Sequence, residues 1–184
     1  INGEASGAVH IMQLFESMVD VVSQGSVRRG RFSPYLPVSH PDIKEFLEIG
    51  TEGNPIQGLT HGVTVDNKWM EEMIEGDTEK RSIWAKVLQR RGEMGYPYIF
   101  FNDNANNGAA DVYKDKKHPI YASNLCTEIM LPSNDEWSFV CVLSSINVLH
   151  YDKWKDTDAV ETMIYFLDAV ISEFLEKLEA YRDS

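Results

Sequence analysis

Helical spacing of apolar residues alternates along this chain with short apolar runs, and this alternation limits the fold more than any other feature. In residues 8–22 and 157–180 the apolar positions recur every three or four residues, as on one face of a helix. The runs at 62–65, 98–101 and 139–143 are short and rich in β-branched or aromatic residues, which is typical of strands. The alternation predicts an α/β fold.

Caps, glycines and prolines divide the rest of the chain. Helix starts are expected at 39–42, at 66–67 and at 77–78, where a capping residue or a proline precedes an apolar face. Residues 32–38 predict a short extended segment that is interrupted by prolines. Two further segments are too rich in turn residues for regular structure. We expect a mobile loop at 51–62 and a turn-rich loop at 102–108.

Composition excludes several classes of function. The 17 basic and 29 acidic residues of this 184-residue chain give a net charge of −12, which argues against binding to a nucleic-acid backbone. No apolar run approaches the roughly 18–20 residues that span a membrane, and no secretory signal opens the chain. Two cysteines predict a reducing, cytoplasmic compartment. The length suits one domain, and the start at Ile1 suggests a processed product or a piece of a longer protein.

The candidate functional residues have ordinary alternatives. Cys126 and Cys141 are too far apart in sequence for a metal-binding clip, and the five histidines form no paired motif, so we expect no metal site. A lone cysteine is usually a small buried hydrophobe. A glycine-bracketed basic loop at 25–31 stands out in this acidic chain, but it lacks the phosphate-binding loop pattern and is by itself no more than a solvated turn.

One segment carries a more specific combination. Asn124, Cys126 and Glu128 alternate, so in an extended loop an amide, a thiol and a carboxylate would face the same side. A neighbouring carboxylate raises the pKa of a thiol, which makes Cys126 a poor thiolate nucleophile. A thiol that stays protonated is better suited to losing a hydrogen atom.

This segment closely resembles a known family. Residues 123–129, followed by 139–147, resemble the finger loop and the next strand of the ribonucleotide reductase large (α) subunit. Upstream, 25–30 resembles the basic loop after the dimer-interface helix, and 52–57 resembles the loop that links effector site to active site. Residues 95–103 resemble the strand before the finger loop. The resemblance therefore covers nearly the whole chain.

The resemblance implies catalytic roles for four residues. Cys126 is the transient thiyl radical that takes the 3′ hydrogen of a ribonucleotide. Glu128 is the general base for the 3′ hydroxyl, and Asn124 hydrogen-bonds the ribose. Cys141 is one half of the redox pair that reduces the 2′ position.

The resemblance also implies an effector site. By this resemblance Arg28, Arg29 and Arg31 would lie by the phosphates of the effector nucleotide, and guanidinium groups suit phosphate oxygens. Gln57 contacts the base of the substrate or effector.

The implied fold is part of a ten-stranded α/β barrel of the ribonucleotide reductase and glycyl-radical type, with flanking helices. We expect residues 1–184 to be a single fragment of that barrel domain. Within it, 1–62 hold the dimer and effector helix with the specificity loops, 63–150 the barrel strands and finger loop, and 151–184 the terminal helix.

The implied partners are a ribonucleoside diphosphate, a small (β) subunit that contains metal and supplies the radical, thioredoxin or glutaredoxin, and a second copy joined through the first helix. The implied effectors are ATP, dATP, dTTP and dGTP, and no cofactor is expected to bind the chain directly. The motifs favour class I over the cobalamin-dependent class.

Three hypotheses follow. The chain is a catalytic-subunit fragment that reduces ribonucleotides only with its missing parts; or it is a non-catalytic effector-binding or dimerisation module; or it is an inert fragment with exposed strand edges.

Overall fold

The computed structural model describes residues 6–23 and 29–182. They form two compact units, Ile1–Ser138 and Phe139–Ser184, called here the N-terminal unit and the C-terminal unit. Each is described by itself. The division of the chain into 1–62, 63–150 and 151–184 stays a prediction.

A parallel sheet forms the centre of the N-terminal unit. Its strands are β1 (Tyr35–Pro37), β2 (Gly62–Val65) and β3 (Tyr98–Phe101), in the order β1-β2-β3, and both neighbours run parallel to β2. Every residue of β2 is buried. The α/β prediction is confirmed, and so are the strands expected at 62–65 and 98–101.

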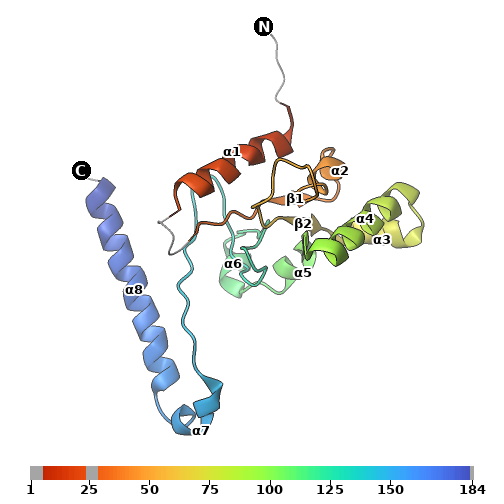
Figure 1. The fold of residues 1–184 in the computed structure, drawn as a ribbon. Helices are drawn as coiled ribbons and strands as arrows, with labels where there is room; N and C mark the ends of the chain where they lie inside the picture. Colours follow the sequence, from red (N-terminus) through yellow and green to blue (C-terminus); the bar gives the residue numbers. More distant parts are fainter. Residues whose placement is uncertain (1–5, 24–28, 183–184) are drawn as a thin grey trace. The chain divides into compact units, whose positions relative to one another are not determined.

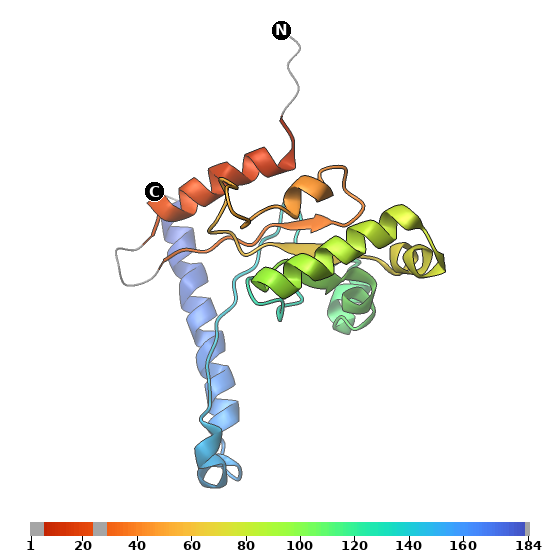
Figure 2. The same cartoon turned by 45° about the vertical axis from the view of Figure 1, so that its right-hand side comes forward.

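The first helices pack on one side of this sheet. They are α1 (Ala8–Val21) and the short α2 (Ile43–Phe46), and α1 lies above the strands in both views (Figures 1 and 2). They contribute to a continuous apolar core around β2. The fully buried members of the core include Phe46, Leu47, Ile49, Ile56, Val63 and Val87.

Two helices make the connection between β2 and β3. They are α3 (Asn67–Glu75) and α4 (Thr78–Met94), and both begin at predicted caps. The Asp66 carboxylate accepts the Trp69 N–H at 2.7 Å, and the Asp77 carboxylate accepts the Lys80 N–H at 3.0 Å. Glycine follows each helix in a positive-φ conformation, at Gly76 and Gly95.

The prediction of a turn-rich loop at 102–108 is wrong, because most of this segment forms helix α5 (Asn102–Asn107). A second short helix, α6 (Asp111–Asp115), follows it. The Asn106 amide explains the difference. It donates to the carbonyls of Asn102 and Ile120 and accepts the N–H of Ile120. A contact across 14 residues thus overrides the local turn preference of asparagine. The loop expected at 51–62 has no helix or strand before β2 begins at Gly62.

The C-terminal unit is helical apart from its first residues. It contains the 3₁₀ turn η1 (Val148–His150), α7 (Tyr151–Trp154) and the long α8 (Ala159–Arg182), which confirms the helix expected near the end of the chain. The buried strand predicted at 139–143 is wrong: the segment pairs with no strand in the described residues, and Val140 and Leu143 are exposed. A strand needs a neighbour to satisfy its backbone groups, and this unit provides none. None of the helices in the described part of the chain is long and apolar enough to cross a lipid bilayer.

Candidate functional site: the turn around Cys126

The segment around Cys126 is a tight turn rather than the extended loop that the alternation predicted. Its first and last residues are linked, because the Asn124 amide donates to the Glu128 carboxylate at 2.8 Å. The Asn124 side-chain oxygen also accepts the N–H groups of Glu128 and Ile129, at 3.2 and 3.3 Å. Cys126 lies exposed at the bend between them. The structure thus brings two of the three predicted residues into contact and places the thiol between them in the chain.

The turn is tied to the sheet by a residue that sequence reasoning missed. The hydroxyl of Tyr35, at the start of β1, donates to the Asn124 carbonyl at 2.8 Å and lies 3.0 Å from the Thr127 hydroxyl. Burial raises the pKa of the Tyr35 phenol, so its proton is retained at neutral pH. Asn124 and Thr127 lie 89 and 92 positions after Tyr35 in the sequence, and no local sequence pattern predicts such a contact.

Tyr98 on β3 is the second residue that the sequence did not single out. Burial raises the pKa of its phenol, and the neighbouring Tyr96 and the Cys126 thiol add to this effect. The Arg91 guanidinium lies 5.3 Å from the centre of the Tyr98 ring and acts in the opposite direction. Cys126 is thus one of the groups that act on the Tyr98 phenol.

Cys141 belongs to the C-terminal unit and is also exposed, so the buried-hydrophobe alternative fits neither cysteine. Both thiols are free. The pairing of Cys141 in a redox couple stays a prediction. Among the described residues no group of three or more His, Cys, Asp and Glu side chains is placed to hold a metal ion.

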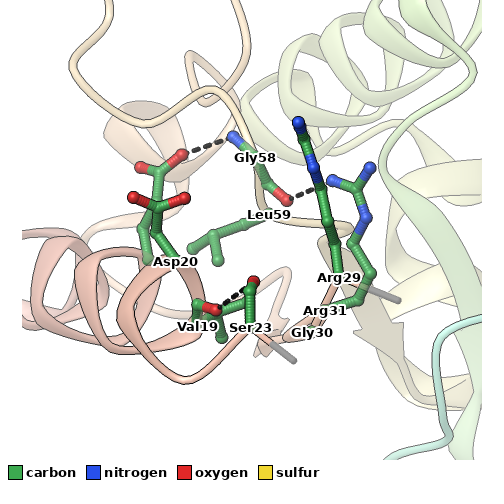
Figure 3. A pocket seen from close by; sticks show the side chains of 9 residues that line it. Val19, Asp20, Ser23, Arg29, Gly30, Arg31, Gly58 and Leu59 are labelled. Carbon is green, nitrogen blue, oxygen red and sulfur yellow. Dashed lines mark hydrogen bonds between the residues drawn. The ribbon is translucent and has the colours of Figure 1, made fainter. Parts of the chain in front are cut away.

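Two of the predicted effector residues, Arg29 and Arg31, line a hollow beside the end of α1. Its volume is about 330 Å³, and Figure 3 shows Asp20 and the side chains of Arg29 and Arg31 on opposite sides of it. Arg31 donates to the Gly58 carbonyl at 3.2 Å. Arg28, the third predicted arginine, lies outside the described residues.

Gln57 holds its own loop together. Its side-chain amide donates to the carbonyls of Thr51 and Asn54, at 2.8 and 2.7 Å. The Glu16 carboxylate on α1 accepts the N–H groups of Gln57 and Gly58. The loop is thus attached to α1 through its backbone, and contact of the Gln57 side chain with a nucleotide base stays a prediction.

Comparison with known proteins identifies the family. The model of the ribonucleotide reductase barrel domain matches residues 1–79 and 73–183. The chain belongs to this family. The fold is therefore part of the ribonucleotide reductase barrel, as the motifs of the finger loop indicated.

Individual reductases agree with this assignment. The class Id ribonucleotide reductase alpha subunit of Actinobacillus ureae is 54% identical, with a TM-score of 0.87 over 94% of this chain and 32% of that one. A chain of Frog virus 3 (isolate Goorha), described as a ribonucleoside-diphosphate reductase large subunit, is 32% identical over 96% of this chain and 34% of its own length. The ribonucleoside-diphosphate reductase subunit alpha of Chlamydia trachomatis is 24% identical over 92% of this chain and 21% of its own length. The chain thus spans about a third or less of the length of these reductases.

Proposed function

We propose that this chain is the part of a ribonucleoside-diphosphate reductase large subunit that carries the radical cysteine, and that it acts when joined to the rest of such a subunit. The observation that supports this most is the turn itself. Asn124 and Glu128 are hydrogen-bonded at its two ends, and the free Cys126 thiol is exposed at its bend. An amide, a carboxylate and a thiol within five residues can together contact one ribose.

Each of these groups has one task in the proposed reaction. The Cys126 sulfur, as a thiyl radical, takes the hydrogen atom from C3′, which leaves an S–H bond and a radical on the sugar. The Glu128 carboxylate takes the proton of the 3′ hydroxyl, and Asn124 hydrogen-bonds the ribose. The 2′ hydroxyl then takes a proton from a cysteine thiol and leaves as water, and two cysteine thiols together supply two electrons and two protons and become a disulfide. Cys141 is one of these cysteines, and the returning hydrogen atom restores the radical on Cys126.

The proposal also assigns what must come from elsewhere. A metal-containing small subunit supplies the oxidising equivalent to Cys126. The remaining large-subunit segments supply the partner of Cys141 and the groups that hold the substrate phosphates. Thioredoxin or glutaredoxin reduces the disulfide, and two free thiols suit work in the reducing cytoplasm.

The test is deoxynucleotide formation by the chain combined with the complementary large-subunit segments and the small subunit. We expect Cys126→Ser to abolish the product and Glu128→Gln to lower the turnover about 10²- to 10⁴-fold, as expected when a general base is lost. Glu136→Gln is the matched control, because Glu136 is an exposed carboxylate further along the same segment. Undiminished product from the Cys126→Ser protein would refute the radical role.

A second proposed function, nucleotide-dependent dimerisation, is supported by α1. Its exposed apolar residues are spaced by three, four and three positions, as in a helix-pairing seam: Ile11, Leu14, Met18 and Val21. The hollow with Arg29 and Arg31 lies at the end of the same helix. A nucleotide whose phosphates contact these arginines would sit beside a helix that pairs with a second copy.

Calorimetry with dTTP and dATP tests this second function, together with size-exclusion chromatography. We expect Arg31→Ala to weaken nucleotide binding and Leu14→Glu to prevent dimerisation. The controls are Lys68→Ala, an exposed cation on α3, and Ser17→Glu, an exposed position on α1 outside the seam. Absence of binding at millimolar nucleotide, with a monomer at every protein concentration, would exclude it.

A further inference from the structure

We propose that Tyr35 is a positioning residue that fixes the turn carrying Cys126. This inference rests on the proposed function, because it matters for catalysis only if Cys126 reacts. The supporting observations are three: a hydrogen-bonded link between β1 and the turn, an unfavourable backbone conformation inside the turn, and packing of the half-buried Tyr35 ring against the other strands of the sheet.

The link has a defined direction. Because the single Tyr35 hydroxyl proton goes to the Asn124 carbonyl, the Thr127 hydroxyl is the donor in its 3.0 Å contact with the Tyr35 oxygen. One phenol thus contacts the residue before the bend and the residue after it. Cys126 lies between these two residues, so both ends of its backbone are tied to the sheet.

The turn needs such support, because Thr127 adopts a left-handed conformation with φ of 67°. This conformation is unfavourable for a β-branched residue and persists only where the surroundings enforce it. The Thr127 N–H, at 3.4 Å from the Asn124 carbonyl, is a weak contact by itself. The Tyr35 hydroxyl contacts both the Thr127 side chain and this same carbonyl, and so it stabilises the bent form.

The ring of Tyr35 is itself held in place. Tyr35 lies opposite Gly62 in the sheet, and a Cβ on Gly62 would overlap the Tyr35 ring. The ring packs edge-on against Phe100 of β3, with 6.1 Å between centres. A side chain that packs against the other two strands of the sheet can fix the position of a loop, whereas a mobile one could not.

Hydrogen exchange of the backbone amides tests the proposal without any enzymatic activity. In the full chain we expect Tyr35→Phe to speed exchange at the Thr127, Glu128 and Ile129 amides about fivefold to a hundredfold, the range for two lost hydrogen bonds. Exchange within β2 should stay unchanged, because the phenyl ring still fills its place. Tyr121→Phe is the matched control, since Tyr121 is exposed and lies three residues before Asn124.

A second variant keeps the test decisive. Thr127→Val removes one of the two links from the side of the loop and keeps the β-branched side chain, so it should speed the same exchange by a smaller factor. Added to Tyr35→Phe it should cause no further increase, because Tyr35→Phe already removes the contact between the Tyr35 and Thr127 hydroxyls. Unchanged exchange in Tyr35→Phe, or fully multiplicative effects of the two changes, would overturn the inference.

Kinetics separate the inference from the proposed function. In the complete subunit we expect Tyr35→Phe to lower kcat while KM for the ribonucleotide stays unchanged, because the phenol orients the reacting thiol and contacts no substrate. Faster exchange in Tyr35→Phe together with full activity of Cys126→Ser would leave the positioning of the turn intact and refute the radical chemistry. If Tyr35→Phe instead raised KM and left kcat unchanged, this result would contradict the positioning role.

Discussion

His61 shows how strongly one side chain can depend on its surroundings. It is 1% exposed, packs edge-on against the ring of Phe46 at 5.2 Å, and lies 5.8 Å from the ring of Tyr96. Burial lowers the pKa of His61 to about 4, and the nearby Leu59 carbonyl opposes this effect only weakly. Neither ring nitrogen makes a well-formed hydrogen bond with the described residues. The folded protein therefore holds His61 neutral.

This environment predicts loss of stability in acid. The pKa of His61 is about 6.5 when unfolded and about 4 when folded, so its contribution is present above pH 6.5 and is lost as the pH falls through 4. The maximum loss from this residue is about 3 kcal/mol. We expect His61→Leu to flatten the fall in unfolding free energy between pH 7 and pH 4, measured by urea denaturation. His10→Leu is the control, because His10 is exposed on α1; equal slopes in all three proteins would contradict the prediction.

At the scale of elements, close approach between β1 and β2 depends on the absence of a side chain. Gly62 begins the central strand, and the Tyr35 ring occupies the space that a Cβ would need. Gly92 differs, because it lies inside α4 and a Cβ there would meet no atom within 4 Å. Replacing glycine with alanine should therefore change the free energy of unfolding in opposite directions at the two positions.

We expect Gly62→Ala to lower the free energy of unfolding by about 1–3 kcal/mol, because the ring must move out of its packed position. Gly92→Ala should raise it by about 0.5–1 kcal/mol, because alanine loses less backbone entropy on entering a helix. Thermal or denaturant unfolding followed by circular dichroism measures both. An unchanged free energy of unfolding in Gly62→Ala would contradict the prediction and would mean that the sheet adjusts without cost.

At the scale of the whole molecule, the described residues leave apolar surfaces without partners. The sheet ends at β1 on one side and β3 on the other, although a parallel sheet is normally enclosed by further strands and helices. In the C-terminal unit no residue of α8 is buried. The exposed apolar residues of α8 include Val160, Ile164, Phe174 and Leu178.

These surfaces predict that the chain associates with itself or with the large-subunit segments that its longer relatives contain. Light scattering after size-exclusion chromatography should give a mass above the 21.0 kDa of one chain. Addition of a polypeptide with the remaining large-subunit segments should convert this material into a one-to-one complex. A stable monomer that does not bind the added polypeptide would instead indicate an inert fragment.

Local features of the chain could be predicted from sequence. The caps at Asp66 and Asp77 and the long C-terminal helix depend on interactions within a few residues, and they are confirmed. The strand at 62–65 is confirmed as well, because its apolar, β-branched residues suit a buried strand wherever its partners lie in the sequence. The motif around Cys126 indicated the family from sequence alone, because Asn124, Cys126 and Glu128 stand among further motifs that extend over nearly the whole chain.

The bend of that motif was decided by tertiary structure. Alternation in sequence implied an extended loop, but the Tyr35 hydroxyl and the Asn124 side chain hold a turn instead. The short strand expected at 139–143 lacks a neighbour, and α5 depends on the contact of Asn106 with Ile120. By itself the sequence determined the α/β class, the main helices and the reactive residue types, since these follow from neighbours along the chain. Only the folded sheet determined how Cys126 is presented, because its support comes from a residue 91 positions away.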